Sequence, residues 1–150
     1  MTILRSSKLD HAFARGHSAL RHVKNPEGWV RGKAVLDTQT GNLEMVLGLE
    51  TDSTSHGVRG RMSVRIFDAK GVEVAYAEMT KPLGIPGKEP GPSRIEEFSI
   101  RRSIPLEAAR RAAKLKVSVT YDGAQFGIWG IPLKDVVKAV KIVIATVAAA

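Results

Sequence analysis

Apolar and polar residues alternate along the middle of the chain with a period of two. The pattern is clearest between residues 115 and 121, where Leu115, Val117 and Val119 alternate with lysine, serine and threonine. Successive side chains of a β-strand point to opposite faces, so this period predicts strands with one buried and one exposed face. Together with the turn residues between them, such patterns predict seven strands, at residues 29–37, 43–49, 62–66, 72–76, 95–104, 115–121 and 125–131.

Turns rich in glycine separate several of these strands. Residues 38–42 and 68–71 each contain a glycine, which adopts positive φ without steric cost, so both predict hairpins. Residues 105–113 begin with proline and predict a short helical turn.

Residues 81–93 predict a long loop. They contain four prolines and three glycines, a composition that favours neither a ladder nor a helix. A loop of this length is either functional or a plain crossover between two sheets.

These elements predict a mainly β fold. We expect a seven-stranded antiparallel immunoglobulin-like β-sandwich over residues 28–131. The likeness concerns architecture alone, because the chain has no cysteine and lacks the disulfide of antibody domains. An open barrel is the alternative.

The two ends of the chain show helical spacing instead. Residues 1–24 place apolar side chains on one helical face, although Gly16 weakens such a helix by about 1 kcal/mol relative to alanine. Residues 133–150 predict an amphipathic helix with an apolar stripe and a lysine face. Valine and isoleucine are β-branched, so a strand over 140–147 is the alternative.

Positive charge is concentrated at these ends. The net charge is +8, of which residues 1–24 carry +4 and residues 134–150 carry +2. A basic end favours an anionic partner such as nucleic acid, lipid headgroups or an acidic protein. A contribution to solubility explains a net charge of this size equally well.

The common signatures of catalysis and metal binding fail on spacing. His11, His17 and His22 are six and five residues apart, whereas a helical zinc pair needs a spacing of four. No Gly-x-Ser-x-Gly motif is present, and Gly87-Lys88 lacks the other residues of a phosphate loop. The sequence therefore predicts no catalytic residue, metal or cofactor.

Arginines on the strands are interpreted as a solvated outer face balanced by glutamates. A phosphate-binding patch is the alternative, but an aromatic content of 5% offers few stacking platforms for single-stranded nucleic acid. Trp29 and Trp129 are expected to cover the sandwich edge or to pack under a terminal helix, rather than to anchor a partner.

The sequence as a whole predicts a binding or assembly module without catalytic function. We expect the partner to be a protein, either a second copy or another chain, with anionic lipid or nucleic acid as further candidates and no small-molecule substrate. The contacts with a partner or a second copy are expected at Leu133, Val136, Val140, Ile144 and Val147. The contacts with an anionic surface are expected at Arg5, Lys8, Arg15, Arg21, Lys134, Lys138 and Lys141.

Two other functions stay open. One is a peripheral membrane protein that uses the lysine face of the C-terminal helix, and the other is an enzyme whose site is assembled across loops. Neither a classical signal peptide nor an apolar run of membrane-spanning length is recognised, so we expect a cytoplasmic protein, with non-classical export as the alternative.

Overall fold

The strands follow the alternation of apolar residues. The computed structural model describes residues 13–24, 27–125 and 140–144. Leu43, Met45 and Leu47 of one strand and Val64 and Ile66 of another have no exposed surface, while the residues between them face outward. The elements are β1 (Phe13–His17), β2 (Arg21–Lys24), β3 (Glu27–Asp37), β4 (Asn42–Thr51), β5 (Gly57–Asp68), β6 (Glu73–Met79), β7 (Leu83–Ile85), β8 (Arg94–Ser103), α2 (Leu106–Arg111), β9 (Ala112–Gln125) and β10 (Val140–Ile144).

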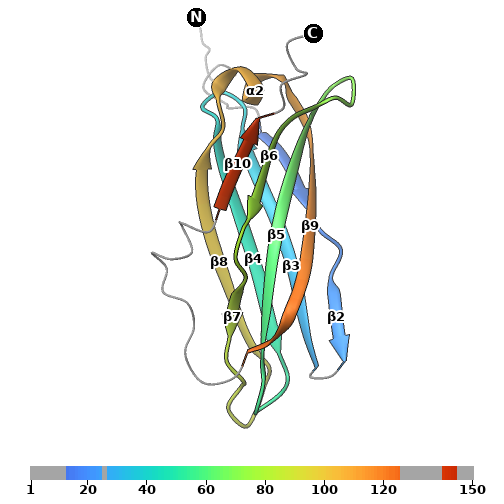
Figure 1. Cartoon of the computed structure of the whole chain (residues 1–150), viewed down its shortest axis with the longest axis vertical. Helices are drawn as coiled ribbons and strands as arrows, with labels where there is room; N and C mark the ends of the chain where they lie inside the picture. Colours follow the sequence, from blue (N-terminus) through green and yellow to red (C-terminus); the bar gives the residue numbers. More distant parts are fainter. Residues whose placement is uncertain (1–12, 25–26, 126–139, 145–150) are drawn as a thin grey trace, which may run out of the picture.

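Two antiparallel sheets pack together in a sandwich-like arrangement (Figure 1). In the β3 sheet, β1 and β2 follow one another along one side of β3, and β4 and β8 follow on the other side. In the β5 sheet, β9 lies on one side of β5, and β6 and β7 follow one another on the other side, with β10 beyond β6. Aliphatic side chains from both sheets fill the space between them.

The prediction of a helix over residues 1–24 is wrong for residues 13–17 and 21–24, which form strands. Residues 1–12 lie outside the described ranges. Phe13, Arg15 and His17 are exposed while Ala14 is buried, so the period there is two. Pairing with β3 satisfies the backbone of both segments, and this tertiary contact outweighs the local helical spacing.

The C-terminal helix expected over residues 133–150 is replaced by a strand at Val140–Ile144, in agreement with the alternative drawn from its β-branched residues. β10 pairs with β6 along the edge of the β5 sheet that lies away from β9. The remaining residues of this predicted helix lie outside the described ranges, as does all but the first residue of the predicted strand at 125–131.

The loop prediction for residues 81–93 is wrong at three residues. Leu83–Ile85 forms β7, which pairs with residues 58–60 of β5. Pro82 and Pro86 flank this strand and have no N–H to donate, so the ladder is confined to the three residues between them. The chain then enters β8 in the other sheet, which confirms the crossover.

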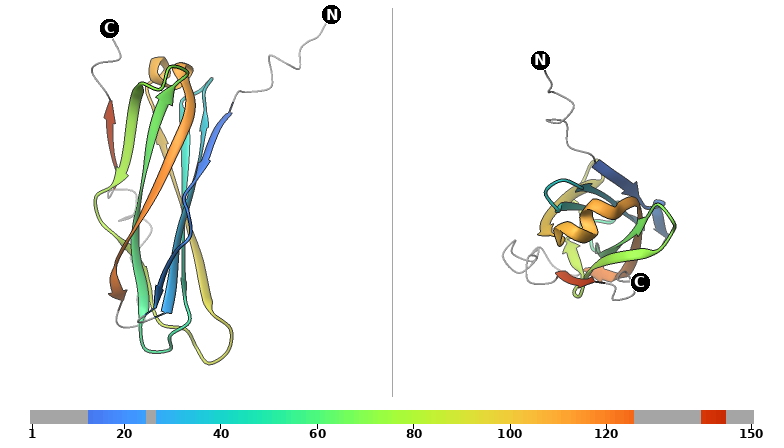
Figure 2. Two further views of the ribbon diagram at one scale, coloured as in Figure 1. Left: turned by 90° about the vertical axis from the view of Figure 1, so that its right-hand side faces the viewer. Right: turned by 90° about the horizontal axis from the view of Figure 1, so that it is seen from above.

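One side of the sandwich is closed where β1 meets β9 (Figure 2, left, blue and orange). These strands belong to different sheets, and their backbones approach closely. A Cβ atom placed on Gly16 would lie 2.7 Å from the carbonyl oxygen of Leu115 and 3.0 Å from its Cβ atom. Only glycine fits here without a shift of one strand.

We therefore predict that Gly16→Ala lowers the free energy of unfolding by about 1–3 kcal/mol, because the new methyl group must displace backbone. Gly48→Ala is the matched control, since its Cβ atom would meet only the flexible side chain of Arg31 at 3.0 Å. Chemical denaturation of both variants checks this. Equal stability losses in the two would show that the approach of β1 to β9 is not the constraint.

Candidate binding surface

The edge of the β3 sheet is interrupted between β1 and β2. Ser18 donates its backbone N–H to the carbonyl of Gly32 at 2.8 Å, and its hydroxyl oxygen accepts the N–H of Gly32 at 2.9 Å. The Ser18 hydroxyl thus takes the place of the backbone carbonyl that a continuous edge strand would offer to the N–H of Gly32. Ala19 and Leu20 then leave the ladder before Arg21 resumes it, and Leu20 is 55% exposed.

Two hollows flank this interruption. One, of about 230 Å³, lies on the outer face of the β3 sheet and has Val46 and two glycines in its lining; the residues around it are His17, Ser18, Leu20, Arg31, Gly32, Lys33, Val46, Gly48 and Glu97. The other, of about 340 Å³, lies between the interruption and β9 and is lined by Ser18, Ala19, Leu20, Arg21, Val117, Ser118 and Val119.

Cationic residues gather at the same place. Residues 13–24 and 112–121, which we call the basic edge, contain five lysines and arginines and neither aspartate nor glutamate. Four of the cationic side chains are exposed, and none of these four forms an ion pair with another described residue: Arg15, Arg21, Lys114 and Lys116.

Two cations of β3 continue the basic edge across the outer face. Lys33 is exposed beside His17, and Arg31 lies between the hollow and Glu50. The closest approach of Arg31 to Glu50 is 3.8 Å, which is long for an ion pair, and both groups are partly exposed. Arg31 therefore keeps most of its capacity to bind an anion.

Elsewhere on the described surface, several arginines have acidic partners. Arg61 donates to Asp122 at 2.7 Å, a hydrogen bond that raises the pKa of Arg61. Arg65 contacts Glu73 at 3.0 Å and lies over the ring of Tyr76, whose hydroxyl donates to Glu78 and thereby has a raised pKa. The prediction that glutamates balance the outer arginines is confirmed for Arg65, whereas Arg61 is paired with an aspartate.

The β4–β8 side of the other sheet is balanced in the same way. Arg94 pairs with Glu96 at 2.6 Å and Arg101 with Glu44 at 3.5 Å. Ser99 also donates to Glu44 at 2.7 Å. Charges are thus matched here, and the basic edge stands out by its lack of acidic residues.

Of the cations predicted to contact an anionic surface, Arg15 and Arg21 lie on the basic edge. Lys141 lies in β10, on the far side of the β5 sheet from β9, together with Val140 and Ile144 from the predicted apolar stripe. The other predicted contact residues lie outside the described ranges: Arg5, Lys8, Leu133, Lys134, Val136, Lys138 and Val147.

The sequence did not single out Lys114 and Lys116, although their alternation with Leu115 and Val117 already placed them on an outer face. Their proximity to Arg15 and Arg21 follows from the packing of β9 against β1 and β2 of the other sheet. Trp29 stacks on His22 of the edge strand, with ring centroids 4.9 Å apart, which fits the expectation that it covers an edge. Trp129 lies outside the described residues.

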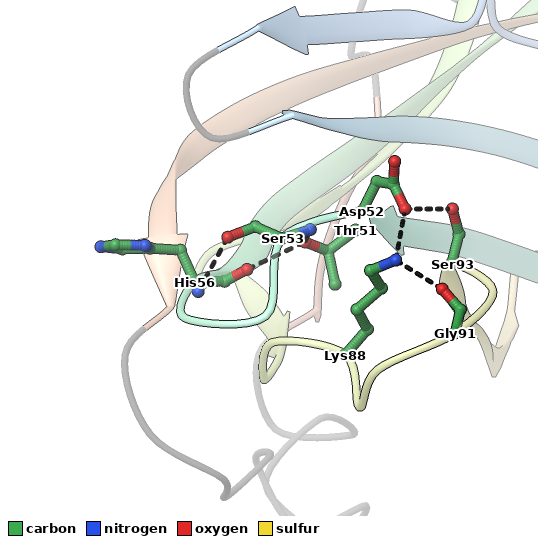
Figure 3. A network of polar contacts seen from close by, with 7 residues as sticks. All are labelled: Thr51, Asp52, Ser53, His56, Lys88, Gly91 and Ser93. Carbon is green, nitrogen blue, oxygen red and sulfur yellow. Dashed lines mark hydrogen bonds and ion pairs between the residues drawn. The ribbon is translucent and has the colours of Figure 1, made fainter.

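A polar network ties together two loops at the end of the sandwich away from α2 (Figures 1 and 3). Lys88 Nζ lies 2.9 Å from Asp52 Oδ1 and donates to the carbonyl of Gly91 at 2.5 Å. Ser93 also donates to Asp52, at 3.1 Å. These contacts join the β4–β5 loop to the segment between β7 and β8.

A serine–histidine contact lies in the same region. Ser55 Oγ is 2.7 Å from His56 Nδ1, but the two residues are neighbours on a turn and Ser55 is exposed to bulk water. The backbone N–H of His56 donates to Ser53, and its carbonyl accepts from Thr51. We interpret these contacts as structuring the turn, because a catalytic pair needs a site that excludes water and Ser55 is exposed.

No family model, characterised protein or solved structure matches this chain. Within the described ranges, no group of three metal-ligating side chains could hold a metal ion, and no helix is long and apolar enough to cross a membrane.

Ser18→Ala should lower the free energy of unfolding by about 1–3 kcal/mol, because the buried N–H of Gly32 loses its acceptor. Ser18→Thr retains the hydroxyl and should cost less. Urea denaturation of the two variants measures both effects. If alanine and threonine cost the same, the hydroxyl does not serve as the acceptor.

Hydrogen bonds from Lys88 and Ser93 lower the pKa of Asp52 below its ordinary value of 3.8. The contribution of this network to stability is thus fully present above that value and is lost as the pH falls through the lower pKa of the folded state. We expect an NMR titration midpoint for Asp52 below 3.8, and a rise toward 3.8 in Lys88→Met. An unchanged midpoint in the variant would contradict the role of Lys88.

Proposed function

We propose that this protein is a non-catalytic binding module that holds an anionic partner along the basic edge. The observation that carries this proposal is that β1, β2 and residues 112–121 of β9 converge on one edge, which contains five cationic residues and no acidic residue. The next residue of β9, Asp122, is paired with Arg61. Three strands from two parts of the chain supply these residues, so no short segment of the sequence displays them together.

The shape of the basic edge favours an extended partner. Residues 13–24 span about 40 Å at roughly 3.3 Å per residue. A line of exposed cations attracts a polyanion over its whole length and releases bound counterions on contact. Binding should therefore weaken steeply as the salt concentration rises.

Support for binding rather than catalysis comes from the positions of the side chains. The exposed cations project from paired strands, which offer a rigid and open surface. The polar cluster at the loop end is occupied with joining two loops. The immunoglobulin-like comparison belongs to this proposal as an analogy of architecture only.

Self-assembly through the predicted apolar stripe stays a separate prediction. Leu133, Val136 and Val147 lie outside the described ranges, and the backbone of Val140 and Ile144 pairs with β6.

The basic edge is tested by charge reversal. Lys114→Glu combined with Lys116→Glu should weaken binding of fluorescently labelled heparin at low salt by about tenfold or more, and should reduce the dependence of affinity on salt. Fluorescence anisotropy measures both quantities.

The matched control reverses two exposed cations away from the basic edge, by Lys81→Glu combined with Lys70→Glu. This control should bind heparin almost as tightly as the wild type. An equal loss in both double variants would assign the effect to net charge, and a wild type that does not bind at low salt would refute the proposal.

A further inference from the structure

Aromatic rings gather on the outer face of the β3 sheet, next to the basic edge. Phe13 is 50% exposed at the start of β1, and the guanidinium of Arg15 lies 5.4 Å from its ring centroid. Eight residues away along β3, His22 and Trp29 stand opposite each other on β2 and β3 and stack, with an angle of 16° between their rings. The chain has only eight phenylalanine, tryptophan and tyrosine residues, and two of them lie on this face.

Cations and the first hollow lie between these two aromatic groups. Arg15 and His17 follow Phe13 on the outward side of β1, and Lys33 and Arg31 lie beside them on β3. Outward residues recur about every 6.8 Å along a strand, so the cations form a row with an aromatic group at each end. The hollow of about 230 Å³ between them has His17, Leu20 and Val46 in its lining, which provide flat and apolar surfaces.

We infer that this face binds single-stranded nucleic acid, with phosphates on the cations and bases against the rings and in the hollow. The inference rests on the proposed function and names the class of polyanion. Every base has a π-face, so stacking on aromatic side chains combined with a cationic groove is a general means of binding a single strand.

Two other polyanions fit this face less well. An acidic peptide would use the cations but would gain little from the stacked His22–Trp29 pair. A duplex keeps its bases stacked inside, so exposed rings on a flat sheet cannot reach their faces. Glu50 and Glu97 lie beyond β3, on β4 and β8. Because these carboxylates repel phosphates, they limit the path of the bound nucleic acid to the β1–β3 side.

The sequence weighed against this ligand because aromatic residues are few. Their number is low, but the sheet places Phe13 and Trp29 on one face with His22 and three cations. The capacity to stack bases depends on how many aromatic rings lie together on one face, and the overall composition does not show this.

The test compares three probes by fluorescence anisotropy at low salt: labelled oligouridylate, a duplex of equal length and a poly-glutamate peptide. Oligouridylate should bind most tightly. Phe13→Ala and His22→Ala remove exposed rings and should each weaken its binding by about five- to a hundredfold, while heparin binding stays close to that of the wild type. Val72→Ala, which truncates another exposed apolar side chain, serves as the control and should leave both affinities unchanged.

Ring variants that bind oligouridylate as tightly as the wild type would overturn the inference, as would tighter binding of poly-glutamate or of the duplex. In either case the proposed function stands if the Lys114/Lys116 double variant still loses heparin binding. Loss of oligouridylate binding in Val72→Ala to the same extent as in the ring variants would also overturn it, since the effect would not be specific to the rings.

Discussion

The close approach of β1 to β9 is the contact on which the rest of the surface depends. Gly16 permits the two backbones to meet across the gap between the sheets, which places cations from residues 13–24 beside those of β9. The second hollow lies along the same contact, between the interruption after Ser18 and residues 117–119 of β9. A larger residue at position 16 would separate the strands and divide the basic edge into two weaker patches.

Much of the fold could be predicted from the sequence, because a half-buried strand carries its own signature. Alternation located β4, β5 and β9, where buried residues occupy every second position. It failed at β1 and β2, because short edge strands bury few side chains and their apolar residues also fit a helix. It failed at β7 because proline content does not show that three residues between two prolines can pair with a neighbouring strand.

The candidate surface was predictable only in part. Net charge drew attention to Arg15 and Arg21, but Lys114 and Lys116 lie about a hundred residues further along the chain and join them only because β9 of one sheet packs against β1 of the other. The stack of His22 on Trp29 depends on the register of β2 with β3, which no local pattern specifies. The position of a strand and the face that it buries can be inferred from the sequence, whereas the fold decides which strands lie next to one another.

The interruption at Ser18 also bears on how this protein avoids aggregation. An unbroken edge strand is a template onto which the strand of another molecule can add, and repeated addition leads to fibrils. Here the edge offers a run of five residues and a run of four, separated by a segment that leaves the ladder. The first run contains Arg15, and the second begins with Arg21 and ends with Lys24. A second copy would gain few backbone hydrogen bonds there and would meet like charges, so the edge disfavours polymerisation while its side chains stay accessible.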